Sequence, residues 1–173
     1  MTDDNGIKAN QFLTFTLDEE VYALGINQVR EVLDFSKITK IPQLPDFMRG
    51  VINLRGGVVP VVDLRLRFGM DASVRTVDTC IIIIEIGIND EETELLGVLA
   101  DSVQEVMSLE PEQIEPPPKI GTRLKTEFIM GIGKRNDDFI IILDINKVFS
   151  FEDLLAIQTI AETGDKIEAC SAG

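Results

Sequence analysis

The chain has 173 residues, which corresponds to one ordinary domain or to two small ones packed together. Hydrophobic residues make up 45% of it, and Ile and Val are abundant. This excludes disorder over the whole length and favours strands, because branched side chains pack well on a pleated surface. The absence of His removes imidazole bases and His-containing zinc sites. The formal net charge of −14 disfavours nucleic acid and anionic membranes as partners.

The cysteines and the N-terminus bear on location. Cys80 lies in an apolar run and Cys170 lies in a polar segment near the C-terminus, and unpaired cysteines fit a reducing cytoplasm. The first residues are acidic, and the apolar run at 81–84 is far too short to span a bilayer. We therefore expect a cytoplasmic protein with no zinc site and no direct contact with a membrane.

The first half of the chain predicts a series of strands. Residues 1–11 are polar and are interpreted as a flexible N-terminus. The apolar pattern then predicts strands at 12–17, 21–26 and 29–32, a helical or turn segment at 45–49, a hairpin made of 50–57 and 58–63 that bends at Gly56 and Gly57, and one helical turn at 64–68. Residues 12–68 are therefore expected to form a first β-barrel unit.

The second half repeats this order after a connector at 69–77, which is small, polar and charged. Strands are predicted at 81–86, 95–100 and 103–106, and a hairpin at 128–133 and 139–144. The segment 81–86 is apolar almost throughout, which implies that both of its faces are buried. Residues 78–149 are expected to form a second β-barrel unit.

The C-terminal part of the chain changes to helical periodicity. Ser150 and Asp153 have the spacing of a capping box, and apolar residues recur at helical intervals after them. This predicts a helix at 150–162 and, because the remaining residues are polar, a flexible tail at 163–173.

An internal repeat connects the two units. Residues 47–68 align without gaps on 128–149, at an offset of 81 positions. The identical pairs are Phe47/Phe128, Gly50/Gly131, Asp63/Asp144 and Phe68/Phe149. Residues 29–32 match 103–106 at an offset of 74. The sequence therefore predicts a mainly β protein made of two similar units that arose by duplication, each of the size of a small barrel.

The two copies differ at one loop. The first copy has Asn53, Leu54, Arg55 and Gly56 where the second has a different sequence, which suggests a task that only the first copy performs. Arg55 either presents its guanidinium to a partner or pairs with an acidic neighbour such as Glu31, and spacing leaves both interpretations open. Our specific prediction is an ion pair between Arg55 and Glu31 that fixes this loop against the adjacent strand.

Several segments together carry a resemblance to a known family. They are Val29–Val32, the run Phe47–Gly56, the run Val58–Leu64, and the second-half segments 96–109 and 128–145. In these residues the chain resembles the CheW-type coupling proteins of bacterial chemotaxis over about residues 12–150. An extra glycine at Gly57, an acidic insertion at 90–94 and a longer C-terminal tail depart from the family pattern.

The resemblance implies a fold of two SH3-like five-stranded β-barrels with short helices, a C-terminal helix and an apolar groove between the barrels. It implies a cytoplasmic, non-catalytic adaptor without a cofactor or a metal. This adaptor would couple methyl-accepting chemoreceptor tips to the regulatory domain of a CheA-type histidine kinase in arrays at the inner membrane. Whether outer strands are exchanged between the barrels stays open. The competing functions are a small-ligand sensor and a carboxylate-dependent hydrolase, both disfavoured because His and Trp are absent and the carboxylates lie in turns.

The resemblance also assigns candidate site residues. The receptor-facing groove would consist of Val29, Val32, Arg55, Val103 and Val106. The surface for the kinase or another partner would include Glu31, Gly50, Asn53, Leu54 and Gly56. The alternative for the four valines is that they belong to the interior of the barrels, since strand alternation buries one face.

Overall fold

The structure is a computed structural model that describes residues 11–72, 74–117, 126–135 and 137–172, with the backbone alone for 126, 135 and 163–172. The expected flexible N-terminus lies almost entirely outside these residues, and Gln11 already belongs to a strand. The expected segments 12–17, 21–26 and 29–32 are strands within one or two residues of their predicted bounds. No described helix is long and apolar enough to cross a membrane.

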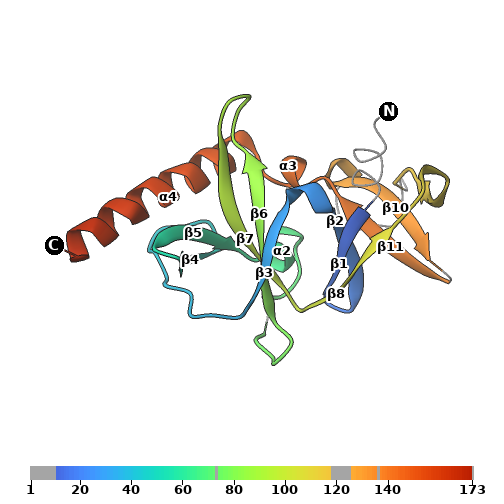
Figure 1. Ribbon diagram of the computed structural model, residues 1–173, viewed down its shortest axis with the longest axis horizontal. Coiled ribbons are helices and arrows are strands. Elements are labelled where there is room, and N and C mark those ends of the chain that lie inside the picture. The colour runs from blue at the N-terminus through green and yellow to red at the C-terminus, as the bar shows by residue number, and fades with distance from the viewer. Residues whose placement is uncertain (1–10, 73, 118–125, 136, 173) are drawn as a thin grey trace.

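Two sheets form the body of the molecule (Figure 1). The first sheet has the order β8-β1-β2-β11-β10-β9, with β1 Gln11–Leu17, β2 Glu20–Gly25, β8 Ser102–Ser108, β9 Ile114–Glu115, β10 Ile129–Arg135 and β11 Asp138–Leu143. The second sheet has the order β3-β6-β7-β5-β4, with β3 Val29–Asp34, β4 Met48–Leu54, β5 Gly57–Val62, β6 Cys80–Gly87 and β7 Thr93–Ala100.

Short helices connect the strands. They are the 3-10 helices η1 Ile26–Gln28, η2 Pro111–Gln113 and η3 Thr126–Phe128, and the α-helices α2 Leu64–Arg67 and α3 Ile145–Val148. The helix α4, Phe151–Ala172, follows the second sheet and extends away from the body of the molecule (Figure 1).

The predicted ranges 12–68 and 78–149 are wrong as boundaries of the two sheets. The first sheet combines β1 and β2 with β8 to β11, and the second combines β3 to β5 with β6 and β7. Strands are therefore exchanged between the two halves of the chain, through parallel pairs of β2 with β11 and of β5 with β7. The ranges were wrong because the alternation within a strand shows which face is buried but not which distant strand pairs with it.

The repeat detected in the sequence is present in the backbone. β4, β5 and α2 recur as β10, β11 and α3 at the offset of 81 residues. Both hairpins shift register at the same point, before Gly50 and before Gly131. The amide of Asp63 donates to the Phe47 carbonyl at 2.7 Å, and the amide of Asp144 donates to the Phe128 carbonyl at 2.8 Å. The duplication therefore preserved backbone hydrogen bonds as well as side-chain types.

The strand β6 shows why its sequence is apolar throughout. Ile82, Ile84 and Ile86 belong to a central core that receives side chains from both sheets and from α2, α3 and α4, whereas Ile81 and Ile83 belong to a separate core within the second sheet. A third core lies within the first sheet. Because β6 lies between two cores, the expected burial of both of its faces is confirmed.

Duplicated phenylalanines form the centre of the molecule. Phe47 contacts Phe149 and Phe68 contacts Phe128, each with ring centroids 6.0 Å apart. These two contacts are equivalent under the repeat, as in a symmetric dimer. The Arg67 guanidinium lies 5.5 Å from both the Phe47 and Phe128 centroids and donates to the Val148 carbonyl at 3.0 Å. The two halves are therefore joined around one cation held by aromatic faces.

The C-terminal helix begins as predicted and ends later. The Ser150 amide donates to the Asp153 carboxylate at 2.9 Å and the Asp153 amide donates to the Ser150 hydroxyl at 3.1 Å, which confirms the capping box. The predicted end at residue 162 is wrong, because the helical backbone continues to Ala172. A polar sequence predicts exposure rather than the end of a helix, because the exposed turns of a helix are polar as well.

Candidate functional site

Glu31 and Arg55 form the predicted ion pair. Arg55 Nη1 and Nη2 both lie 2.7 Å from Glu31 Oε1, and Nη2 lies 2.8 Å from Oε2. Such a forked contact fixes both side chains more precisely than a single bond between a lysine and a carboxylate does. Of the Arg55 side chain, 68% remains exposed, against 30% for Glu31, so the pair is anchored from the Glu31 side and open to a partner on the Arg55 side.

The loop that carries Arg55 is a two-residue hairpin turn. Leu54 pairs with Gly57, so the chain bends at Arg55 and Gly56 rather than at the expected Gly56 and Gly57. Both turn residues have positive φ, 51° for Arg55 and 86° for Gly56, as a hairpin of this length requires. The Gly56 amide donates to Asn53 Oδ1 at 2.9 Å. The Asn53 side chain therefore stabilises the turn. The backbone conformation of the turn directs the Arg55 side chain toward β3.

The ion pair joins the two edges of the second sheet. Glu31 lies on β3, at one edge, and Arg55 follows β4, at the other edge. An ion pair between opposite edges requires the sheet to curl round on itself, as in a small barrel. Glu31 and Arg55 therefore close the barrel at the place where their loop is exposed.

The four valines occupy equivalent positions on the edge strands β3 and β8. Val32 and Val106 are 40% and 49% exposed. Val29 and Val103 are half-buried and pack against the central core. Val29 and Val103 therefore pack against the interior, whereas Val32 and Val106 lie at the surface, and a receptor contact of the exposed pair stays a prediction. Each edge strand presents one exposed valine and anchors itself with the other.

Cys80 lies between the two edge strands. It pairs with Asp34 of β3, and its thiol contacts the backbone of Val103 on β8. Burial, followed by the charge of Asp34, raises the pKa of this thiol above its usual value, so Cys80 stays protonated. The end of β3 and the start of β8 therefore approach each other at Cys80.

The remaining candidates of the partner surface divide by exposure. Asn53 and Gly56 are exposed and Leu54 is half-buried. Gly50 is buried, with φ at 142°, and a Cβ at this position would lie 2.1 Å from the Thr39 carbonyl oxygen. The expectation that Gly50 contributes to a partner surface is therefore not supported by its position, because the chain at Thr39 covers it. Its role is to let that segment approach β4 closely.

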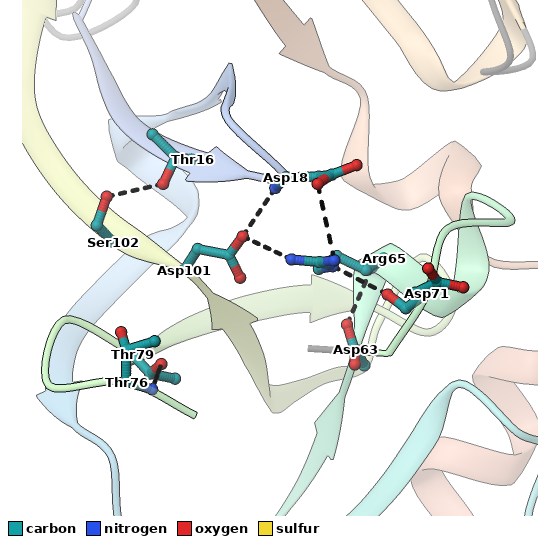
Figure 2. Close-up of polar contacts among 9 residues, drawn as sticks. All are labelled: Thr16, Asp18, Asp63, Arg65, Asp71, Thr76, Thr79, Asp101 and Ser102. Carbon is teal, nitrogen blue, oxygen red and sulfur yellow. Dashed lines mark hydrogen bonds and ion pairs between the residues drawn. The ribbon is translucent and has the colours of Figure 1, made fainter. Parts of the chain in front are cut away.

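A polar network that sequence reasoning missed connects the two sheets (Figure 2). Arg65 on α2 donates to the Asp101 carboxylate at 2.9 Å and to the Asp71 carbonyl at 2.9 Å, and its guanidinium lies 3.8 Å from the Asp18 carboxylate. The Asp18 amide donates to Asp101 at 2.7 Å, and the Arg65 amide donates to the Asp63 carboxylate at 3.0 Å. The network therefore holds the β1–β2 turn against α2.

The repeat contained a signal for this network. The residue equivalent to Arg65 in the second copy is Asn146, which donates to the Gly87 carbonyl at 3.1 Å and accepts from Gln28 at 3.3 Å. Both copies thus place a bridging polar side chain at the start of the short helix. The sequence signal for this position is that the two copies have different residue types, as they also do at Arg55.

The two aspartates that the repeat aligns lie at the starts of short helices. Asp63 and Asp144 occupy the N-cap positions of α2 and α3. The Asp63 carboxylate accepts a hydrogen bond from the Arg65 amide. The Asp144 side chain makes no such cap bond. Within the described part of the chain, no group of His, Cys, Asp and Glu could hold a metal ion. The features that remain are exposed valines on two strand edges and a rigid arginine loop.

Comparison with known proteins agrees with this geometry. The family model described as CheW-like domain matches residues 11–153. A chemotaxis protein CheW from Klebsiella aerogenes is 35% identical over 153 residues, which cover 88% of this chain and 89% of the relative. A chemotaxis protein CheW from Bacillus subtilis is 32% identical, with coverage of 82% and 88%. The crystal structure of the scaffolding protein TtCheW from Thermoanaerobacter tengcongensis is similar, with a TM-score of 0.75, 39% identity, and coverage of 85% and 93%.

Proposed function

Because the chain belongs to the CheW-like family and is an adaptor of chemotaxis signalling, we propose that it couples methyl-accepting chemoreceptors to a CheA-type histidine kinase and has no turnover of its own. The observation that carries this proposal is the pair of exposed valines, Val32 and Val106, on two equivalent edge strands. A scaffold binds through such apolar patches and obtains most of its affinity from a few anchors.

The receptor tip is the proposed ligand of the valine surface. Val32 and Val106 would contact the apolar face of a receptor helix, while Val29 and Val103 hold the edge strands against the central core. A helix that lies in an apolar groove is a common mode of recognition. Arg55 would contribute a charged contact beside this surface, since most of its side chain is exposed.

The hairpin loop is the proposed element of the kinase surface. Asn53, Leu54 and Gly56 shape the loop, and Glu31 fixes it through Arg55. A loop held in one conformation loses little entropy on binding, which favours affinity for a folded partner. With these two surfaces, we propose that the adaptor works in the cytoplasm, at receptor arrays of the inner membrane.

Replacement of an exposed valine tests the receptor surface. Val106→Glu should weaken binding of a purified receptor fragment at least tenfold, because a charge in an apolar contact is costly to desolvate. The melting temperature should change little, since Val106 is 49% exposed. The matched control is Val77→Glu, at a fully exposed valine of the connector, which should bind as the native protein does. Native affinity in Val106→Glu would contradict the proposal, and unfolding would assign Val106 to the core.

A second measurement tests the absence of turnover. The purified protein should not hydrolyse ATP or esters, and it should bind the regulatory domain of the kinase. Hydrolysis that disappears when one carboxylate is replaced would overturn the adaptor assignment, whatever the outcome of the receptor experiment.

A further inference from the structure

The distribution of cations in this acidic chain is uneven. Most described Lys and Arg side chains lie within 4.0 Å of a carboxylate; these are Arg30, Arg55, Arg65, Arg67, Lys134 and Lys147. The other described cations, which have no such carboxylate, are Lys37, Lys40, Arg49 and Arg75. With 30 acidic residues against 16 basic ones, unpaired cations are not expected to gather at one place by chance.

All four of these cations line a single cavity of about 370 Å³. Its walls also include the apolar side chains of Phe35, Ile38 and Leu99. Phe35 is half-buried, and the Arg75 guanidinium lies over its ring, 4.3 Å from the centroid. The cavity therefore combines an apolar floor with a positive rim, and the aromatic contact holds one of the cations in place.

The acidic insertion lies at the opposite end of the same hairpin. Thr79 and Leu99, which line the cavity, lie at the base of the β6–β7 hairpin, and Asp90 to Glu92 form its tip. The tip is exposed and projects beyond the rest of the sheets (Figure 1). The amides of Glu91 and Glu92 donate to Asn89 Oδ1 at 2.8 and 2.9 Å, so the tip has a defined shape.

These opposite charges cannot meet within one molecule. β6 has eight residues, and a strand rises about 3.3 Å per residue, so about 26 Å separate its two ends. Asp90 and Glu91 have no cation within 4.0 Å among the described residues. Each molecule therefore carries an unneutralised acidic projection at one end of the hairpin and an unneutralised basic cavity at the other.

We propose that the cavity lined by Lys37, Lys40, Arg49 and Arg75 is a docking site for the acidic β6–β7 tip of a second copy of this chain. The contact is heterologous, since the tip of one molecule occupies the cavity of the next, and it generates a row or ring of copies. Charge complementarity supplies most of the attraction, so the association is weak and depends on salt. It uses none of the proposed receptor and kinase residues and does not depend on those assignments.

Sedimentation of the full chain tests this contact. The native protein should show a mass that rises with concentration at low ionic strength and returns to the monomer at about 0.5 M salt, where charges are screened beyond a few ångströms. Two variants separate the halves of the contact. The cavity variant carries Lys37→Glu and Arg49→Glu, and the tip variant carries Asp90→Lys and Glu91→Lys. Each variant should remain monomeric by itself, with dissociation constants for self-association at least tenfold weaker than native.

A mixture of the two variants provides the decisive result. The acidic cavity of one then faces the basic tip of the other, and the native cavity faces the native tip, so association should return to the native level. Both variants keep a negative net charge. A general attraction between two oppositely charged molecules therefore does not explain a recovery of association in the mixture. A control with Arg30→Glu and Lys134→Glu, which has the same change of net charge as the cavity variant but away from the cavity, should associate as the native protein does.

Several outcomes overturn the proposal. They are a native protein that stays monomeric at every concentration at low salt, cavity or tip variants that associate as the native protein does, and a mixture of the two that fails to recover. Circular dichroism of each variant shows whether it is folded. The replaced side chains make no ion pair that a reversal removes, so both variants should fold.

Discussion

Arg55 has a backbone conformation that is unfavourable for arginine. Its φ of 51° lies in the left-handed region, which costs a residue with a Cβ roughly 1–2 kcal/mol. Asparagine or glycine would occupy this turn with less strain. The bidentate contact with Glu31 offsets part of the cost, but a partly exposed pair contributes only about 0–1 kcal/mol. Stability therefore does not account for an arginine at this position, which agrees with the proposed contact between Arg55 and a partner protein.

Charge reversal at this pair distinguishes binding from stability. Arg55→Glu or Glu31→Arg should weaken partner binding several-fold and change the melting temperature by only a few degrees, because the pair is partly exposed. The double variant should recover part of the binding, since the reversed pair again fixes the loop. Titration of receptor fragment and kinase domain into each variant measures this. No recovery in the double variant would show that the loop conformation is not what the partners require.

Tyr22 gives the protein a pH dependence in alkaline solution. Burial, followed by the charges of Glu20 and Asp18, raises the pKa of its phenol from 10.0 to about 12. The unfolded chain then loses this proton at lower pH than the folded one, so the free energy of unfolding should fall as pH rises from about 10 to about 12. Tyr22 is the only tyrosine, and Trp is absent, so ultraviolet absorbance reports this group alone.

The control for this titration is Tyr22→Phe. It keeps a ring that stacks on Phe15 and Phe68, 6.1 and 6.0 Å away between centroids, and it removes the ionisable group. The fall in stability above pH 10 should then be smaller than in the native protein. A phenol that titrates near 10 while the protein is still folded would contradict the burial of Tyr22.

At the scale of elements, a short segment covers the outer strand of each repeated hairpin, which is β4 in β4–β5 and β10 in β10–β11. Thr39 exchanges two hydrogen bonds with Val51, at 2.8 and 2.9 Å. In the second copy β9 pairs with β10 at the equivalent place. Gly50 and Gly131 allow this approach in their respective copies. Paired edges are protected from association with other chains, whereas no described strand pairs with the outer sides of β3 and β8.

Replacement of Gly50 should therefore damage the fold. Gly50→Ala would place a Cβ 2.1 Å from the Thr39 carbonyl oxygen at a φ of 142°, so the free energy of unfolding should fall by more than about 1 kcal/mol. The matched control is Gly25→Ala, at a φ of −58° with no atom within 4 Å of the added Cβ, where little change is expected. Equal effects in a denaturant titration would contradict the account of Gly50.

At the scale of the whole molecule, the two sheets are held together by a shared apolar core and by polar contacts around Arg65. The core contains aromatic contacts that the duplication makes equivalent. The Arg65 side chain is 15% exposed and joins α2 to the β1–β2 turn and the β7–β8 connection (Figure 2). The relative position of the edge strands, and hence of the exposed valines, depends on both.

Removal of the Arg65 charge should loosen this arrangement. Arg65→Gln leaves Asp101 and Asp18 without their cation, and hydrogen bonds to charged groups contribute about 1.5–3 kcal/mol each, so stability should fall by that order. Hydrogen exchange should increase at the β1–β2 turn first. The control Arg30→Gln removes an exposed pair with Glu85 and should have a much smaller effect. Unchanged exchange at the turn in Arg65→Gln would contradict a role in joining the sheets.

The sequence by itself determined the features that depend on local pattern. The strands, the repeat at an offset of 81, the helix cap at Ser150 and the two-sided burial of β6 follow from alternation, identity and spacing, which are properties of neighbouring residues. Arg55 was found because one copy differed from the other, and its pairing with Glu31 is confirmed.

Only the tertiary structure decided which strands are neighbours. It showed the exchange of strands between the halves, the split of the four valines into exposed and half-buried pairs, and the burial of Gly50 beneath Thr39. The cavity and the Arg65 network also join segments far apart in the chain. Each of these depends on contacts between residues separated by tens of positions, which alternation within a single strand does not encode, because many pairings bury the same faces equally well.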